Sequence, residues 1–412
     1  MPAVCFYFEV HQPFRLRPFT IFDIGSGPTP VYFDDAKNAE IVRRVAAKCY
    51  IPVNRVLLHE IHRHEGRFRV AFSVTGTALD QLASHAPHVL ESFDALAATG
   101  AVEFLCETDN HSLAALYSWD EFDAVVASHR ARIRALSGRE PTVFRNTELI
   151  YSDQLAKRVE ALGFQGVLAD GVPRILDGRS PGFAYRPAGA GGLVTLTKNP
   201  ELSDDIAFRF SDRNWKDWPL TAPKFAAWIR ALEGHAQTVN LFMDYETFGE
   251  HHWAPTGILE FLSALPQEIL RYPENSFATP GELVQRLEPR GEFHSPGWIS
   301  WADVDRDLSA WLGNHLQQDA ARTIYDLREP VLKSGDATLL TTWRRLLTSD
   351  HFYYMSLKAF GDGEVHRYFS PYGSPYDAYI YFMNVASDFR FRLGLDRKAG
   401  PRAIGPRTPS AA

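Results

Sequence analysis

Short apolar segments alternate along most of the chain with segments whose apolar residues recur at helical spacing. Several of the short segments are almost continuously apolar, as expected for strands that are covered on both faces. The expected strands are residues 3–10, 68–74, 102–106, 142–145, 166–169, 206–210 and 239–243. The helical patterns are residues 39–48, 79–98, 122–136, 152–162, 225–232 and 258–265.

This alternation of strand and helix predicts a parallel α/β fold. About seven strand–helix units in about 250 residues fit a closed barrel better than an open sheet. We therefore expect an irregular (β/α)7 barrel over residues 1–290. The Gly-rich stretch 177–192 is expected to be a mobile loop.

The pattern changes near residue 290, where Pro- and Gly-containing turns end the alternation. Residues 304–328, 337–360 and 376–392 then show mainly helical patterns. We predict a C-terminal helical region over residues 291–397, packed on the barrel and contributing to its cleft, because a Trp-rich stretch lies at the junction. Residues 398–412 are rich in Pro, Gly and Ala and are expected to form a disordered tail.

The charge balance excludes two kinds of partner. With 43 basic and 50 acidic residues, the formal charge is −7. The chain therefore lacks the basic footprint of a nucleic-acid-binding protein and the polybasic run that attracts anionic membranes. No apolar run approaches the ~20 residues that span a bilayer. No secretory signal is visible, and Cys5, Cys49 and Cys106 are far apart, so we expect a cytoplasmic protein.

Polar side chains follow several of the expected strands directly. His11 follows the first strand, His111 follows the third shortly after Glu107, Glu148 follows the fourth, and Asp244 follows the last. Because the carboxyl ends of parallel strands meet at one rim of a barrel, we expect these side chains to line one polar pocket.

Carboxylates at different strand ends, together with an aromatic content of 13%, point to sugar chemistry. Aromatic rings suit a cleft that stacks on the flat apolar faces of sugars. Retaining glycosidases use two carboxyl groups ~5–5.5 Å apart, one a protonated acid and the other an ionised nucleophile. Spacing alone leaves the candidates Glu107, Asp109, Glu148, Asp170, Asp244, Glu246 and Glu250 open.

A metal site is a weaker alternative. His251 and His252 follow the last expected strand, but neither a His-x-x-x-His pair nor a Cys partner supplies the spacing of metal ligands. We therefore predict no metal and no cofactor.

Five blocks carry a family resemblance, in chain order from residue 11 to residue 314. They are His11-Gln12-Pro13, Gly100-Ala101-Val102-Glu103, Asn146-Thr147-Glu148-Leu149-Ile150-Tyr151, Phe242-Met243-Asp244-Tyr245-Glu246-Thr247-Phe248-Gly249-Glu250, and Trp301-Ala302-Asp303 with Trp311-Leu312-Gly313-Asn314. As an ordered set they resemble glycoside hydrolase family 57. The resemblance implies an α-amylase-like enzyme with an incomplete seven-stranded barrel and a helical C-terminal region.

The resemblance also implies roles for individual residues. Glu148 matches the nucleophile and Asp244 the general acid/base. The other implied site residues bind substrate: His11 and Glu103 line or brace the −1 sugar site, Trp253 and Trp301 stack on sugar rings, Asp303 binds hydroxyl groups, and His111 lies among them. Asp109 and Asn110 depart from the pattern, because amylase-like relatives have aromatic residues there.

Together these features predict a retaining glycoside hydrolase of α-1,4-glucans such as maltodextrin, glycogen or starch, acting through a covalent glycosyl-enzyme intermediate. A 4-α-glucanotransferase with the same pair is the first alternative. A metal-dependent polysaccharide deacetylase is a second, with His11 and residues 251–252 as its only candidate ligands. A non-catalytic glucan-binding relative is a third, and the intact carboxylates Glu148 and Asp244 speak against it.

Overall fold

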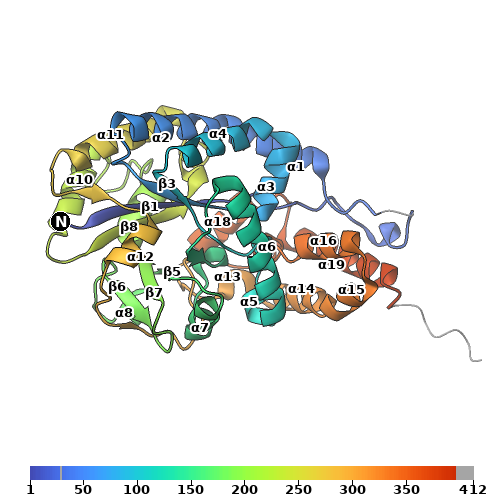
Figure 1. The fold of residues 1–412 in the computed structure, drawn as a ribbon. Helices are drawn as coiled ribbons and strands as arrows, with labels where there is room; N and C mark the ends of the chain where they lie inside the picture. Colours follow the sequence, from blue (N-terminus) through green and yellow to red (C-terminus); the bar gives the residue numbers. More distant parts are fainter. Residues whose placement is uncertain (28–29, 396–412) are drawn as a thin grey trace, which may run out of the picture.

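Seven parallel strands form the framework of the computed structural model, which describes residues 1–27 and 30–395 (Figure 1). The strands are β1 (Ala3–Val10), β2 (Val70–Val74), β3 (Val102–Phe104), β4 (Val143–Arg145), β5 (Gly166–Asp170), β7 (Val194–Lys198) and β8 (Thr238–Asp244). One sheet has the order β3-β2-β1-β8, and β4, β5 and β7 belong to a second. The predicted tail at 398–412 lies outside the described residues.

A few hydrogen bonds on each side join the two sheets into an irregular barrel. A parallel bridge between Cys106 and Phe144 connects β3 to β4. On the other side, the Asn199 N–H donates to the Asn240 carbonyl (2.8 Å), and the Asn240 side chain donates to the Thr197 carbonyl (2.8 Å). The predicted (β/α)7 fold class is confirmed.

One of the seven predicted strands is wrong. Residues 206–210 overlap the end of helix α9 (Pro200–Ala207), where Asn199 accepts a hydrogen bond from the Leu202 N–H (3.0 Å) and Pro200 occupies the first turn. Both features favour a helix start. The seventh barrel strand is β7 instead. The predicted loop at 177–192 contains a further strand, β6 (Ala184–Pro187), antiparallel to β7.

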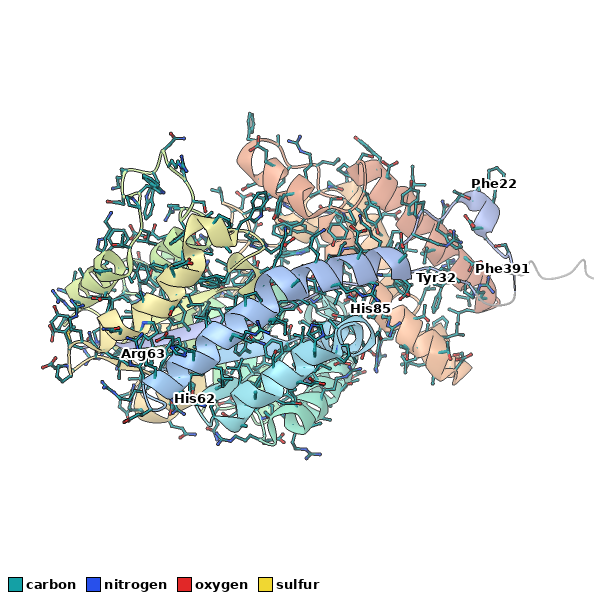
Figure 2. All side chains as sticks on the ribbon, turned by 90° about the horizontal axis from the view of Figure 1, so that it is seen from above. Phe22, Tyr32, His62, Arg63, His85 and Phe391 are labelled. Carbon is teal, nitrogen blue, oxygen red and sulfur yellow. The ribbon has the colours of Figure 1, made fainter. Side chains whose placement is uncertain are left out.

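Helices cover the outside of the barrel. Residues 35–63 run as α1 (Asp35–Val45), a π-turn η2 (Ala46–Tyr50) and α2 (Ile51–Arg63), and Figure 2 shows this long rod ending near His62 and Arg63. The others are α3 (Gly76–His85), α4 (Pro87–Ala98), α5 (Ala114–Tyr117), α6 (Trp119–Ser137), α7 (Asp153–Ala161), α8 (Pro173–Leu176), α10 (Ala222–Ala231), α11 (Ile258–Leu270) and α12 (Pro280–Arg286). The single helix predicted over residues 79–98 is divided between α3 and α4, because Pro87 disfavours helical backbone at Ala86.

The alternation of side chains along β1 decides what enters the barrel. Val4, Phe6, Phe8 and Val10 pack outward with the helices, while Ala3, Cys5 and Tyr7 pack inside with Phe242. Glu9 continues the inward set and pairs in register with Asp244 of β8. Because successive side chains of a strand point to opposite faces, both carboxyl groups lie inside the barrel near its carboxyl end.

The C-terminal part of the chain forms a helical layer. It consists of α13 (Ser309–Leu312), α14 (His315–Tyr325), α15 (Arg328–Ser334), α16 (Ala337–Leu346), α17 (Asp350–Tyr353), α18 (Phe360–Phe369) and α19 (Pro375–Arg392). Its core around Trp311, Trp343 and Phe352 includes Leu113 and Ile150 of the barrel chain. The helices that the structure describes are all too short or too polar to cross a membrane.

Candidate active site

A cavity of about 620 Å³ lies where the carboxyl ends of the barrel strands meet the C-terminal helical layer. It is lined by residues of both parts, from Glu9 and Asp244 of the strands to Asp350 of α17 and Tyr368 of α18. Six of the eight predicted site residues line it, namely His11, His111, Glu148, Asp244, Trp301 and Asp303.

The other two predicted residues, Glu103 and Trp253, lie outside this cavity. The Glu103 carboxylate accepts a hydrogen bond from the Gly281 N–H (2.7 Å), so it anchors the start of α12. Trp253 is 63% exposed and lines a separate cavity of about 350 Å³ beside Lys48. We therefore leave both residues out of the proposed site, and their substrate-binding roles stay predictions.

Glu148 is held at both carboxylate oxygens. It lies in a turn, η3 (Thr147–Leu149), with a left-handed backbone at Glu148 (φ 56°) and Leu149 (φ 50°). Oε1 accepts a hydrogen bond from His111 Nε2 (3.1 Å), and Oε2 accepts one from Trp301 Nε1 (2.6 Å). Left-handed backbone costs a non-glycine residue about 1–3 kcal/mol, so the surrounding contacts must enforce it.

His111 lies between the carboxylates of Glu107 and Glu148. It is buried, and its Nδ1 lies 3.1 Å from Glu107 Oε2 and 3.2 Å from Glu9 Oε1. Burial would lower the pKa of His111, but the negative charges of Glu9, Glu107 and Glu148 raise it well above its ordinary value. A protonated imidazole donates from both nitrogens, so neither remains for substrate. These contacts support a positioning role for His111, and its predicted substrate-binding role stays a prediction.

Arg145 completes this buried network and was not among the predicted site residues. The guanidinium forms two hydrogen bonds with Glu9, one of them 2.6 Å long, and lies 5.0 Å from the centre of the Trp301 ring. The sequence signal was a charged residue within an otherwise apolar strand, seen for Glu9 in β1 and Arg145 in β4. Such buried charges persist only when they are paired.

The pKa values of the two candidate catalytic carboxyl groups are shifted in opposite directions. Burial alone would raise the pKa of Glu148, but the hydrogen bond and charge of His111, together with Arg145 and Trp301, lower it. Burial and the negative charge of Glu148 raise the pKa of Asp244 to about 6. One group is therefore an ionised carboxylate where the other still carries a proton, which is the division of roles that acid and nucleophile require.

Replacing His111 with glutamine tests whether the positive charge of His111 lowers the pKa of Glu148. The amide can still donate to Glu148, but the positive charge is lost, so the pKa of Glu148 should rise and the acidic limb of the pH–rate profile should move to higher pH. We expect kcat/KM to fall about 10- to 100-fold, as for loss of a charged hydrogen bond. Trp301→Phe is the matched comparison, because it removes the other donor without removing a charge. If the acidic limb lay at the same pH in both variants, the charge of His111 would not be what lowers the pKa of Glu148.

The C-terminal layer supplies partners for two further site residues. His11 Nε2 lies 2.9 Å from Asp350 Oδ2, and its ring stacks on His111 with centroids 4.1 Å apart. Asp303 forms an ion pair with Lys358 (2.8 Å) and lies 3.1 Å from His366 Nε2. The His11–Asp350 contact joins the helical layer to the barrel directly at the cavity.

Glu246, one of the candidates that spacing left open, adds another carboxyl group to the cavity. It is bound by Tyr50, at the end of the π-turn, and by Gln12 (3.3 Å). Burial raises the pKa of Glu246 to about 8. Glu246 is therefore protonated at neutral pH and does not compete with Glu148 as a carboxylate.

Among the residues that the structure describes, two groups of side chains could bring metal ligands together, His11 with His111 and Asp350, and Glu9 with Glu107 and His111. Each includes His111, whose nitrogens both face carboxylates. A protonated imidazole has no lone pair for a metal, so the donor set suits a hydrogen-bond network better. His252 lies apart, with its nitrogens 2.7 Å from Ser211 Oγ and 2.9 Å from the Ala207 carbonyl. His251 lines the same cavity as His11, but among the described residues neither His251 nor His252 belongs to a group of close metal-ligand atoms with His11.

Three known proteins are among those that the chain resembles. A protein of Methanocaldococcus jannaschii named "Putative alpha-amylase" is 41% identical over 401 residues, which are 95% of this chain and 84% of that protein. A 4-alpha-glucanotransferase from Thermococcus litoralis superposes with a TM-score of 0.66 at 15% identity, covering 95% of this chain. A branching enzyme from Thermococcus kodakaraensis gives the same TM-score and identity, covering 95% of this chain and 90% of that one.

The chain spans 60% of the length of the glucanotransferase, and at 15% identity the two solved structures show the fold alone. The sequence profile described as "Glycosyl hydrolase family 57" matches residues 5–296. The resemblance inferred from the five sequence blocks is confirmed. The chain therefore belongs to glycosyl hydrolase family 57, and it is an enzyme that hydrolyses glycosidic bonds or transfers glycosyl groups.

Proposed function

We propose that the protein is a retaining glycoside hydrolase of α-1,4-glucans, with Glu148 as nucleophile and Asp244 as general acid/base. The observation that carries the proposal is the opposite pKa shift of these two carboxyl groups in one cavity. The α-amylase-like relative and the family match support an α-glucan as substrate. A cytoplasmic location, and the absence of nucleic-acid or membrane partners, stay predictions.

The reaction has two steps that conserve the anomeric configuration. The Glu148 carboxylate attacks C1 while the glycosidic C1–O bond breaks, and Asp244 gives its proton to the departing oxygen. In the second step the Asp244 carboxylate takes a proton from water as the water oxygen attacks C1. The bond to Glu148 then breaks, which restores both carboxyl groups and the α-configuration.

Incubation with maltoheptaose, followed by proton NMR, tests the proposal. We expect α-anomeric products to form first and to be absent with Glu148→Gln. Early β-anomeric products would contradict retention, and an active Glu148→Gln variant would contradict the assignment of the nucleophile. Longer chains among the products would show transfer to sugar, the 4-α-glucanotransferase alternative.

The pH dependence of kcat/KM should reflect the two carboxyl groups. Asp244 must be protonated in the first step, so activity should fall as the pH rises through its pKa of about 6. Glu148 must be ionised, so activity should fall again where the pH drops below its lowered pKa. Rates on maltoheptaose across the acidic and neutral range measure both limbs. A basic limb that persists in Asp244→Asn would assign it to another group, such as Glu246.

A further inference from the structure

Three basic residues lie along one wall of the cavity, where a neutral glucan offers them no opposite charge. Arg15 follows the His11-Gln12-Pro13 block, and Lys37 and Arg44 belong to α1. Residues seven apart lie on one face of a helix. The Arg15 carbonyl accepts a hydrogen bond from the Asp34 N–H (2.9 Å), so Arg15 is tied to the start of α1. The segment after β1 and helix α1 therefore form one basic wall.

Two of these charges already have acidic neighbours. Arg44 Nη2 lies 3.0 Å from Glu250 Oε1, so its charge is balanced at the cavity. Lys37 Nζ lies 3.7 Å from Glu40 Oε2, and both side chains are exposed. An exposed ion pair of this kind contributes little, so Lys37 is free to turn to a ligand at low cost.

Arg15 carries a buried charge whose direct partners are neutral. The residue is only 9% exposed, and its guanidinium donates to the Pro13 carbonyl (3.3 Å) and to Gln12 Oε1 (3.3 Å). Within the part of the chain that the structure describes, Arg15 forms no ion pair. A guanidinium has five N–H donors, so donors remain for a ligand. Because a buried charge is costly without an opposite charge, an anionic ligand would complete this wall.

Two acidic groups of the cavity lie near the basic wall without occupying it. Glu246 is protonated at neutral pH, because burial raises its pKa to about 8. Asp350 is ionised: burial would raise its pKa, but the charges of His11 and Arg15 lower it. The Asp350 oxygens are bound by His11 (2.9 Å) and Tyr354 (3.3 Å) and not by Arg15. The donors of Arg15 thus remain available to a ligand in the cavity.

We propose that Arg15 and Lys37 bind a phosphate monoester carried by a glucan, so that the cavity accepts phosphorylated glucans. This inference rests on the proposed function and narrows its substrate class. A guanidinium presents two N–H donors to two phosphate oxygens, and a lysine adds a point charge. A chain of four residues spans at most about 14 Å, so Arg15 lies within that distance of His11. The phosphate is bound and not transferred, and its sugar lies in the same cavity as the bond that is cleaved.

Binding to the Glu148→Gln variant tests the phosphate site without cleavage of the ligand. Malto-oligosaccharides of one length that carry a single 6-phosphate are compared, by isothermal titration calorimetry, with the same sugars after phosphatase treatment. We expect the phosphate to tighten binding about 10-fold or more, as for a hydrogen bond to a charged group. Arg15→Gln in the same background should bring the two dissociation constants to within about threefold of each other.

Two further variants make the test specific. Arg44→Gln removes an equal charge from the same wall and should keep the preference for phosphate, because Glu250 balances that charge. Lys37→Gln is a second test should Arg15→Gln fail to fold, since the Lys37 side chain is 45% exposed. It should weaken the preference about threefold, as for a partly exposed charge.

Equal affinity for the two sugars, or a preference that survives both Arg15→Gln and Lys37→Gln, would overturn the phosphate site while the hydrolase stands. Inorganic phosphate that binds through Arg15, without any preference for the phosphorylated sugar, would show a site for the free anion only and would also overturn it. If the wild type left maltoheptaose intact, the proposed function would fail. The ratio of dissociation constants would still decide the phosphate site, because it does not depend on turnover.

Discussion

Replacement of Glu148 by alanine is expected to abolish glucan cleavage, and azide is expected to restore reaction of an activated donor. Without the carboxylate no glycosyl-enzyme can form, so we expect kcat to fall about 10⁴-fold or more, as for loss of other catalytic nucleophiles. Azide can occupy the space left by the side chain and attack C1 from the same face. Its product should be the β-glycosyl azide, which NMR distinguishes from the α-anomer.

The position of Glu148 makes this test specific. His111 and Trp301 hold its two oxygens, so Glu148→Gln keeps the shape of the site while losing the nucleophile. Glu160→Gln is the control, because that carboxylate lies on α7 and bonds the Gly192 N–H away from the cavity. It should retain wild-type activity. An α-glycosyl azide from Glu148→Ala, or full activity without azide, would remove Glu148 from the role of nucleophile.

The barrel could be predicted largely because its strands are buried on both faces. Six of the seven strands appear as apolar runs, and continuous apolarity is a signal that local sequence contains. β7 was missed because Thr195 and Thr197 are buried with their hydroxyls, which makes the strand look polar. The neighbouring run 206–210 is apolar because Ile206 and Phe210 pack with the core from the end of α9. The apolar residues of this run are therefore explained by burial at the end of a helix and not by a strand.

The site was predictable only where chain position fixes geometry. His11, Glu148 and Asp244 follow strands, and parallel strands bring their ends to one rim. The other wall depends on contacts that no local pattern encodes: Asp350 meets His11 across 339 residues. The same limit applies to the two predicted residues outside the cavity. Glu103 lies in the second block and Trp253 follows the fourth, but the packing of α12 and of the loop after β8 decides whether their side chains line the cavity.

The conformation of Glu148 also lies beyond sequence patterns. Glu148, His111 and Asp303 all have left-handed backbone, with φ between 50° and 56°. Non-glycine residues adopt it rarely, and such residues cluster at functional sites. In each case a long-range partner holds the side chain: Trp301 for Glu148, Glu9 for His111, and Lys358 for Asp303. The long-range contacts therefore hold these three residues in the strained backbone conformation.

Replacement of Asp244 by asparagine should separate the two steps of the reaction. The amide cannot protonate a departing sugar oxygen, so we expect cleavage of maltoheptaose to fall about 10²- to 10⁴-fold. Fluoride leaves without a proton, so release of fluoride from α-maltosyl fluoride should fall far less. The basic limb near pH 6 should disappear at the same time, because the group that titrates there is gone.

The azide product gives the deciding contrast between the two variants. In Asp244→Asn the nucleophile is intact, so the glycosyl-enzyme forms and azide, which needs no base, attacks it from the face opposite Glu148. The product should be the α-glycosyl azide, against the β-anomer from Glu148→Ala. If both variants gave one anomer, the two carboxyl groups would not have separate roles, and the difference in their pKa shifts would reflect burial alone. Opposite anomers would assign each carboxyl group to one face of the sugar.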